Sequence, residues 1–554
     1  MDAAIWAQVR SFIDAIQLKS GDNNAKALAL SRVPHLRGLG QLVDRADAAE
    51  RCSVEVRFQT KRTRGDGSPA PESILLQSDN VLLATGSRAV RLPSLVDWYD
   101  VEINQHVRCC DSDTIKSLSF LPRRVVIVGG GIIAIEFARI FAALAADVTM
   151  VVRADNLPKS LERVGIDRSL GFVLQRELIA SGVRLLFESE VDGAAAIPRG
   201  TTKTASYPPV LDVSVIDSKT KAPRDTLPAD LILTATGRRG VTNSLGLETM
   251  GIDVSGIGDV VVGEDLMTSA AGVYAAGDCI GAPQLASTGI AQAEAAVDTM
   301  FGNAASPAAA AEASDTEGFS PKVLLSNAAR YPIGIWTMPE VAFVGLTAAA
   351  ATSPPHNLDV VEGVGRYSES IRGHVHSVGT PREGEYLPPC SDDGDEAGGG
   401  PDCRSLSGPS LKLVLERAAP HRIVGVHIFG DDACELIHFG TTLVQEGKGL
   451  ADILAVCFAA VTYHELYKLA ALDAAATLQE DAWRALYHEL DRDGDGNLAQ
   501  EEVRKTLERR AASQSAIDDI IKALFAGSKG SVGIEQFVKR AQRLSNPLRL
   551  EIIA

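Results

Sequence analysis

The sequence lacks several features that define well-known structural classes. No apolar run approaches the roughly 20 residues of a membrane-spanning helix, and the opening MDAAIWAQVRSFIDAIQ lacks the basic-then-apolar pattern of a signal peptide. Basic residues are outnumbered, 54 against 71 acidic ones, which argues against nucleic acid or an anionic membrane as the main ligand. These absences predict a protein with no membrane span and no nucleic-acid partner.

Cysteine is also scarce. The 554 residues contain eight cysteines without regular spacing, and no C-x-x-C or C-x4-C pair. The pattern excludes a disulfide framework of the kind that small secreted proteins use. We therefore expect ordinary thiols in a reducing setting inside the cell, with the cytoplasm as the predicted compartment.

The rest of the chain is long enough for about three or four domains. Apolar residues make up 45% of it, which is sufficient for a large core. Residues 124–152 read as strand, glycine turn, helix and strand, and they form a predicted βαβ unit. Further predicted elements are strands at 53–57, 74–86, 183–187, 230–236 and 332–347, a strand pair at 411–430, and helices at 166–181 and 432–447.

The βαβ unit carries the first candidate site. Its turn, Gly129-Gly130-Gly131-Ile132-Ile133-Ala134, fits G-x-G-x-x-G/A. Gly129 permits the tight turn, Gly131 lets the backbone approach a pyrophosphate at the helix N-terminus, and the small Ala134 lets helix and strand pack closely. The alternative is a purely structural glycine turn. The strand on either side of the helix favours dinucleotide binding.

The residues after the second strand of this unit bear on the choice between NAD and NADP. An acidic side chain there would bind the ribose 2′-hydroxyl, but this chain has Val152, followed by Arg153 and, further on, Lys159. Two cations suit a 2′-phosphate, which predicts that NADP(H) is at least accepted. The alternative is two solvated surface cations, and the nearby Asp155 weakens the phosphate interpretation.

Several blocks together resemble the flavoprotein pyridine nucleotide-disulfide oxidoreductase superfamily, and above all its soluble (Si-specific) NAD(P)+ transhydrogenase branch. The resemblance covers about residues 35 to 476. The blocks are VLLATGSR (81–88), CDSDTIKSL (110–118), TATGRRGVTNSLGLETMGI (234–252), VYAAGDCIGAPQLAS (273–287), TMPEVAFVGLT (337–347) and IVGVHIFGDDACELIHFG (423–440).

The resemblance implies an α/β flavoprotein with FAD-binding and NAD(P)-binding dinucleotide domains, an α+β dimerisation domain and a homodimer. Asp278 would hold the ribityl chain of FAD, and Ala286 would mark the approach of the backbone to the flavin ring. Further cofactor-binding positions would be Thr85, Gly86, Gly237 and Gly277. Resemblance and composition together predict the domains 1–120 (incomplete FAD portion), 121–238 (NAD(P)), 239–302 (returning FAD segment), 303–320 (low-complexity linker), 321–476 (interface, with a disordered insertion at 380–410) and 477–545 (appended EF-hand module).

One part of the family pattern is missing. The family has an N-terminal glycine fingerprint for FAD, but here the first ATG strand comes at about residue 84, too early for a complete flavin domain before it. We therefore expect a chain truncated at its N-terminus. The resemblance also gives Glu136 a catalytic pairing with a lysine beside the flavin. That lysine would lie in the missing part, which predicts a solvated or orphaned Glu136.

The catalytic base distinguishes two activities within the family. In the disulfide reductases an H-P-T-x-x-E segment supplies a His–Glu base; here Glu465 is present, but Ala460 occupies the histidine position and His464 is displaced. The resemblance therefore implies a transhydrogenase, in which FAD takes hydride from one nicotinamide nucleotide and passes it to the other in a ping-pong sequence. Two alternatives stay open: a dihydrolipoamide-dehydrogenase-like disulfide reductase, and a calcium-responsive NAD(P)-binding protein without catalysis.

A separate signal lies near the C-terminus. The stretch from Asp491 to Glu502 matches the twelve-residue EF-hand loop, in which Gly496 makes the sharp turn and Glu502 closes the site in a bidentate manner. The predicted Ca2+ ligands are Asp491, Asp493, Asp495, Asn497 and Glu502. A degenerate second hand follows, with Phe525, Gly527, Lys529 and Gln536 in its ligand positions, and we expect it to be metal-free. Whether calcium regulates, stabilises or docks the protein is left open by the sequence.

Overall fold

The computed structural model describes residues 2–43, 52–59, 71–103, 106–197, 210–302, 331–377, 408–509, 514–528 and 530–542. The chain divides into two compact units, and Phe343 is the first residue of the second. The predicted linker 303–320 and most of the predicted insertion 380–410 lie outside the described residues. Within the described part, no helix combines the length and the apolar character needed to cross a membrane.

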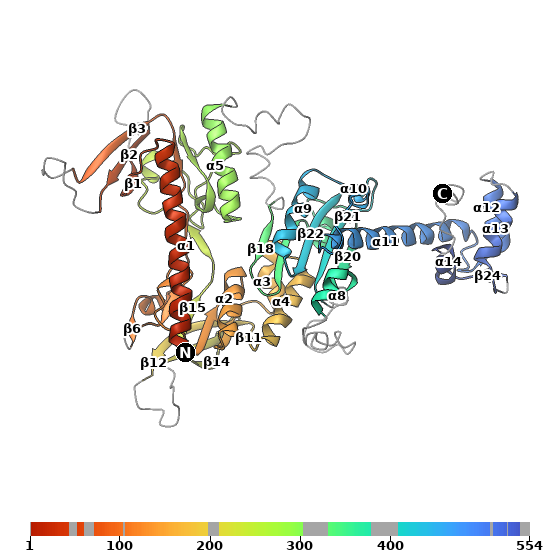
Figure 1. Ribbon diagram of the computed structural model, residues 1–554, viewed down its shortest axis with the longest axis horizontal. Coiled ribbons are helices and arrows are strands. Elements are labelled where there is room, and N and C mark those ends of the chain that lie inside the picture. The colour runs from red at the N-terminus through yellow and green to blue at the C-terminus, as the bar shows by residue number, and fades with distance from the viewer. Residues whose placement is uncertain are drawn as a thin grey trace. The chain divides into compact units, whose positions relative to one another are not determined.

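The first unit is built around a five-stranded parallel sheet in the order β11-β10-β9-β15-β8. Figure 1 shows α2 and α4 beside this sheet. The strands are short and rich in Val, Ile and Leu, as expected for a sheet buried on both faces. They are β8 (Cys109–Asp111), β9 (Arg124–Val128), β10 (Asp147–Val151), β11 (Arg184–Leu186) and β15 (Leu231–Thr234), with helices α2 (Ile132–Ala143), α3 (Leu157–Leu161) and α4 (Arg168–Ala180) between them.

The two faces of β9 are covered differently. Val126 and Val128 pack against a three-stranded antiparallel sheet, whose inward side chains include Val213 and Leu227. This sheet comprises β12 (Ser189–Ala196), β13 (Leu211–Asp217) and β14 (Pro223–Ala229), and the sequence analysis did not predict it. Helix α2 packs on β9 and β10 through its fully buried Ala134, Ile135 and Ala138. The predicted βαβ unit and the helix predicted at 166–181 are confirmed.

The remainder of the first unit contains small sheets and two long helices. The meander consists of β1 (Leu39–Val43), β2 (Cys52–Arg57) and β3 (Ser73–Ser78); the parallel pair is β4 (Val81–Leu83) with β17 (Val273–Ala275); the antiparallel pair is β5 (Ser87–Ala89) with β16 (Arg238–Gly240). A β6–β7 hairpin (Glu102–Ile103, His106–Val107) and helix α5 (Ala286–Phe301) complete it. Of the segments 53–57 and 74–86, predicted as strands of a small meander, β2 and β3 lie in the meander, whereas β4 follows after a turn and belongs to another sheet.

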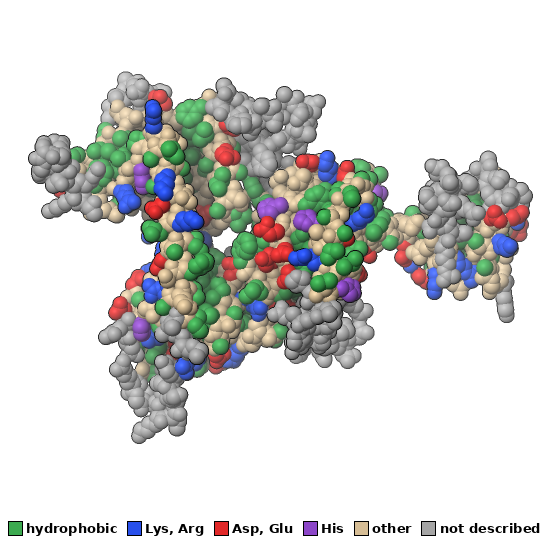
Figure 2. Space-filling model, in the orientation of Figure 1, with side chains coloured by type: hydrophobic (Ala, Val, Ile, Leu, Met, Phe, Trp, Pro, Cys, Tyr) green, Lys and Arg blue, Asp and Glu red, His purple; other side chains and the backbone are tan. Residues whose placement is uncertain are grey.

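Helix α1 spans Asp2–Leu30 and precedes β1. Its Trp6 is buried, stacks on Phe141 and donates an indole hydrogen bond to the carbonyl oxygen of Leu118 at 2.7 Å. Most of the other described side chains of α1 are exposed, including Phe12 and Leu30, and green apolar side chains appear along its surface in Figure 2. Trp6 is therefore the main buried anchor of this helix.

A five-stranded sheet in the order β18-β19-β22-β21-β20 includes the strands of the second unit, and its β20, β21 and β22 pair antiparallel. Strand β18 and the first half of β19 precede Phe343. The strands are β18 (Ile333–Ile335), β19 (Glu340–Gly345), β20 (Val360–Arg366), β21 (Ser410–Glu416) and β22 (Ile423–Gly430). The helices are α7 (Ala348–Thr352), α8 (Ile371–Ser377), α9 (Ala433–Gln445), α10 (Leu450–Ala455) and α11 (Glu465–Leu490). The strand pair predicted at 411–430 and the helix predicted at 432–447 are confirmed.

The last elements form two helix–loop–helix units. They are β23 (Leu498–Ala499), α12 (Gln500–Arg509), α13 (Gln514–Leu524), β24 (Ser531–Val532) and α14 (Ile534–Ala541), and β23 pairs with β24. Helix α11 leads into the first loop without a break, as Figure 1 shows, so the predicted domain boundary at 476/477 falls inside one helix. The same helix therefore packs on the sheet and enters the loop.

Two glycines in β20 let α11 approach the sheet closely. A Cβ on Gly363 would lie 2.2 Å from the carbonyl oxygen of Ala470, and one on Gly365 would lie 2.5 Å from that of Leu466. Both obstacles are backbone atoms, which a rotamer change cannot move. Small side chains on α11, namely those of Ala470, Ala471 and Ala474, are fully buried at this contact.

We expect Gly363→Ala to destabilise the second unit by about 1–3 kcal/mol, because the added methyl group forces α11 away from β20. The measurement is the denaturation midpoint in urea, followed by far-UV circular dichroism. Gly256→Ala is the matched control, since no atom lies within 4 Å of its added Cβ. Equal midpoints for the two variants would contradict the close packing of helix and sheet.

Candidate functional site

The glycine turn lies between β9 and α2, at the carboxyl end of the parallel sheet. Gly129 has a φ of +133°, and a Cβ there would lie 2.3 Å from the carbonyl oxygen of Ala235. Gly130 is restricted by side chains, because a Cβ would lie 2.4 Å from the hydroxyl oxygen of Ser160 and 2.7 Å from Cγ1 of Val152. The first two glycines are thus required by the protein's own packing.

Gly131 differs from its neighbours. It is the N-cap residue of α2, and no side chain caps the helix there. A Cβ on Gly131 would have no atom within 4 Å. The first amides of α2 therefore face open space, which is the arrangement that accepts a pyrophosphate. The residues of this turn fit a dinucleotide.

The two cations predicted to bind a 2′-phosphate are both engaged with acidic side chains. Arg153 follows β10, and its Nε lies 3.7 Å from Oε1 of Glu190. Lys159 pairs with Asp155 at 2.9 Å. Both basic side chains are more than half exposed, so these ion pairs contribute little to stability. The sequence alone therefore does not show that these cations are paired, because Glu190 comes from β12 and Asp155 from the turn before Lys159.

Asp278 lies in a short 3-10 turn, Gly277–Ile280, after β17. Its carboxylate accepts a hydrogen bond from the hydroxyl of Ser87 at 2.6 Å. The amide of Gly277 donates to the side-chain oxygen of Gln292 on α5 at 2.8 Å, which ties the turn to that helix. Ala286 is the exposed first residue of α5. This arrangement fits the ribityl chain of FAD, because the Asp278 carboxylate could accept a hydrogen bond from one of its hydroxyl groups.

The two ATG segments are joined through their glycines. Gly86 accepts a hydrogen bond from the amide of Val241, and Gly237 accepts one from Val90. Both glycines have positive φ, and neither has an atom within 4 Å of an added Cβ. The hydroxyl of Thr85 donates to the carbonyl of Val241 at 2.7 Å, so it contributes to this junction.

The pyrophosphate end of FAD has no counterpart among the described residues. Residues 2–43 form α1 and β1, and no strand–glycine turn–helix unit occurs in them. The described residues therefore fit only part of FAD, and no chemical step of the flavin follows from their geometry.

Glu136 is half-buried on α2, and its Oε1 accepts a hydrogen bond from the amide of Trp336 at 2.9 Å. Burial raises the pKa of this carboxyl group, although the bond from Trp336 opposes the shift. The segment between β18 and β19 thus supplies a backbone donor to Glu136, so its carboxylate is not simply solvated; its pairing with the family's lysine stays a prediction.

Glu465 is the first residue of α11, and its Oε2 accepts from the amide of Thr462 at 3.3 Å. This is a local contact at the start of a helix. Ala460, in the position of the family's histidine, is exposed, as is His464. The described geometry thus gives Glu465 a local contact with the backbone before the helix, and its catalytic role stays a prediction.

The thiols near the parallel sheet are poor nucleophiles. Cys109 and Cys110 are buried in β8. Burial raises the pKa of Cys109 to about 12 and that of Cys110 to about 11. Both stay protonated at neutral pH, and a protonated thiol does not attack a disulfide.

The loop from Asp491 to Glu502 brings carboxylate oxygens together. One oxygen each from Asp491, Asp493 and Glu502 lies within 4.8 Å of the others. Backbone amides hold these groups: Asp491 accepts from Gly494 and Gly496 at 3.1 Å, and Glu502 accepts from Arg492 at 3.1 Å and Ala499 at 2.8 Å. Asp495 accepts from the amide of Asn497 at 2.7 Å. Such a set of oxygens fits a hard cation, and calcium binding here stays a prediction.

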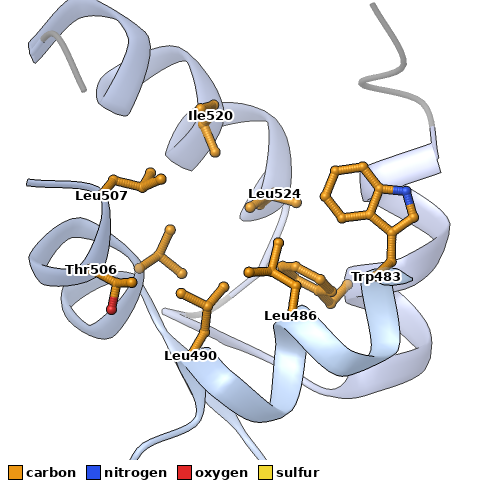
Figure 3. A pocket seen from close by; sticks show the side chains of 9 residues that line it. Trp483, Leu486, Leu490, Thr506, Leu507, Ile520 and Leu524 are labelled. Atoms are coloured by element: carbon orange, nitrogen blue, oxygen red, sulfur yellow. The ribbon is translucent and has the colours of Figure 1, made fainter. Parts of the chain in front are cut away.

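A compact apolar core supports this loop. Figure 3 shows Trp483, Leu486 and Leu490 of α11 facing Leu507, Ile520 and Leu524, around a cavity of only ≈ 10 Å³. Tyr487 connects the two loops, since its hydroxyl donates to the carbonyls of Gly496 at 2.8 Å and Val532 at 3.2 Å. Trp483, Tyr487 and Leu490 of this helix are all buried in the core.

The sequence analysis missed several residues that shape these sites. Ser87, beside Asp278, and Gln292, beside Gly277, lie 191 and 15 positions away from their partners. Glu190 follows Arg153 by 37 positions on another sheet. No local spacing could have identified these contacts, because the topology of the fold creates them.

Comparisons with known proteins agree with this architecture. Residues 18–294 match the family described as pyridine nucleotide-disulphide oxidoreductase. The soluble pyridine nucleotide transhydrogenase of Mycobacterium bovis (strain BCG / Pasteur 1173P2) is 31% identical over 402 residues, covering 73% of this chain and 69% of that protein. The protein of the same name from Yersinia pestis (strain Pestoides F) is 30% identical over 401 residues, covering 72% and 70%.

Solved structures show the same fold at lower identity. LpdA from Mycobacterium tuberculosis is similar with a TM-score of 0.62 and 19% identity, over 85% of this chain and 83% of that one. The Cu(II) complex of the flavoprotein disulfide reductase RclA from Escherichia coli is similar with a TM-score of 0.58 and 20% identity, over 83% and 85%. With the family match and the 31% identical relative, these findings identify the chain as a member of the pyridine nucleotide-disulphide oxidoreductase family.

Proposed function

We propose that the chain is an FAD-dependent oxidoreductase that moves hydride between NAD(H) and NADP(H), as a homodimer. The observation that carries this proposal is the open N-terminus of α2 at Gly131, which suits the pyrophosphate of a nicotinamide nucleotide. The relatives at about 30% identity that are named transhydrogenases support it.

Two features favour hydride exchange over disulfide reduction. The family's histidine position holds Ala460, so no imidazole can protonate a thiolate leaving group there. The adjacent thiols of Cys109 and Cys110 are buried, and their raised pKa keeps them protonated. Hydride transfer between nicotinamides needs neither group.

Each part of the site then has a limited role. The amides at the start of α2 bind the nucleotide's pyrophosphate, and Ala134 keeps that helix close to β9. The Asp278 carboxylate accepts a hydrogen bond from a hydroxyl group of the flavin's side chain. Ser87 and the Gly277 turn hold Asp278 in position. If FAD binds, it would supply the redox chemistry of hydride exchange, while these residues would hold its side chain.

We expect the purified 554-residue chain to show flavin absorbance after FAD is added. NADPH should bleach that absorbance, and an oxidised NAD analogue should restore it. The measurement is a visible spectrum at each step. Bleaching without restoration would contradict the transhydrogenase proposal, and restoration by a disulfide would favour a reductase of the dihydrolipoamide-dehydrogenase type.

A second candidate function is a nucleotide- and calcium-binding protein without catalysis. Helix α1 favours it, because a mostly exposed helix precedes β1 where a flavin pyrophosphate turn would be needed. Stoichiometric NADPH binding without any uptake of FAD would support this candidate over the first.

The C-terminal module binds calcium in either case. Asp491, Asp493, Asp495 and Glu502 supply carboxylate oxygens, and Asn497 supplies its backbone carbonyl. The mutual approach of Asp491, Asp493 and Glu502 in the loop supports this role. The second loop only completes the pair, through the β23–β24 contact between Leu498 and Val532.

A further inference from the structure

The residues that follow β10 lie beside the start of β12. The amide of Val152 donates to the carbonyl of Leu186 at 2.8 Å, and that of Ser189 donates to the carbonyl of Val152 at 3.0 Å. Arg153 and Glu190 become neighbours as a result. We infer that Glu190 sets the preference between NADP(H) and NAD(H) by competing with the 2′-phosphate for Arg153, and that Lys221 relieves this competition. The inference rests on the proposed function, since it concerns the same nucleotide site.

The ion pair between Arg153 and Glu190 is loose enough to be exchanged. Its 3.7 Å separation is longer than a charge-assisted hydrogen bond, and the Arg153 side chain is 80% exposed. An exposed pair of this kind is weak. A 2′-phosphate carries more charge than a carboxylate and can bind the guanidinium through two hydrogen bonds, so it displaces Glu190 from Arg153.

Glu190 has a second cationic partner. Lys221, in the turn between β13 and β14, pairs with the other carboxylate oxygen of Glu190. When Arg153 leaves Glu190 and binds a phosphate, Glu190 therefore keeps its ion pair with Lys221. Without Lys221, the carboxylate would depend on Arg153 alone and would hold it more firmly.

The neighbouring cations are already matched. Lys159 pairs with Asp155 at 2.9 Å, and Lys219 pairs with Glu188. Of these four basic side chains in the described structure, Arg153 has the longest ion pair. A phosphate that binds Arg153 therefore breaks the weakest of these four ion pairs. NAD(H) lacks the 2′-phosphate, so Arg153 stays paired with Glu190 when NAD(H) is bound. The site can therefore bind both nucleotides.

The test is the affinity of the full chain for NADPH and for NADH, measured by nucleotide fluorescence and by calorimetry. We expect Glu190→Gln to lower the Kd for NADPH by about 3- to 5-fold and to leave that for NADH within about 2-fold, the range of an exposed ion pair. Lys221→Met should weaken NADPH binding by about 3-fold, and it should lose most of this effect when combined with Glu190→Gln.

Matched control variants distinguish the effect of the ion pair with Arg153 from the effect of a change in net charge. Glu188→Gln and Lys219→Met make the same charge changes on the neighbouring pair, which does not include Arg153. If they alter the NADPH-to-NADH ratio as much as the Glu190 and Lys221 variants do, only long-range charge acts and the inference is overturned. An unchanged ratio in Glu190→Gln, at an unchanged melting temperature, also overturns it. Failure of the native chain to bind either nucleotide overturns the proposed function itself.

Discussion

Replacing Gly131 by aspartate should strongly weaken nucleotide binding while leaving the protein folded. The position tolerates a side chain, because its φ is −87° and nothing lies within 4 Å of an added Cβ. An aspartate there would cap the uncapped α2 and stabilise that helix by a few tenths of a kcal/mol, since glycine is itself a good N-cap residue. Its carboxylate would occupy the space and the amides that the pyrophosphate needs. We expect the Kd for NADPH to rise roughly 100-fold, equivalent to about 2.7 kcal/mol.

Stability and binding should therefore change in opposite directions, which few loss-of-function variants do. The measurements are the melting temperature and NADPH fluorescence titration of the full chain. Gly131→Ala is the control for size: it adds a methyl group to open space and should weaken binding far less. If the aspartate variant binds NADPH like the native chain, the nucleotide does not contact the start of α2 and the site is misassigned.

Features encoded within a short stretch of sequence were predictable. The turn from Gly129 to Ala134 and the loop from Asp491 to Glu502 can each be recognised from residue spacing within one short stretch, although the packing that restricts Gly129 comes from the distant Ala235. The βαβ unit was predictable for the same reason, because its apolar periodicity changes from strand to helix within one run.

Features created by topology were not predictable. The β12–β14 sheet brings Glu190 to Arg153, and this contact changes the interpretation of the nucleotide's ribose end. The backbone donor of Glu136 comes from Trp336, 200 positions later. The domain boundary predicted at 476/477 could not be located from the sequence for another reason. The alanine-rich middle of α11 continues the helix across it, although the packing partners of α11 change from the β-sheet to the core of the C-terminal module.

This continuity of α11 matters for the calcium loop. Near the sheet, Arg417 pairs with Asp481 of α11 and with Asp359 at 3.1 Å. One turn later, Arg484 pairs with Glu535 of α14 at 2.9 Å. The amide of Asp491, the first residue of the loop, donates to the carbonyl of Tyr487 at 2.8 Å. A rearrangement of the loop thus acts directly on the helix that packs against β20.

Replacing Glu502 by glutamine should remove calcium binding. Glu502 closes the loop, and its two oxygens lie where the loop's amides and the carboxylates of Asp491 and Asp493 converge. A neutral amide offers one oxygen in place of two and no charge, whereas Ca2+ requires 6–8 oxygen ligands with several carboxylates. We expect the Kd for calcium to rise by at least about 100-fold, or roughly 2.7 kcal/mol. Calorimetric titration of the chelator-treated chain measures it.

Glu501→Gln is the control, because it removes the same charge one residue away. Glu501 is exposed and pairs with Lys505 at 2.9 Å, outside the ligand set. It should shift the calcium affinity by no more than about 2-fold, the effect of a screened surface charge. Equal losses in both variants would mean that the module attracts calcium by general negative charge. Retained stoichiometric binding in Glu502→Gln would contradict the loop assignment, since no bidentate carboxylate would then close the site.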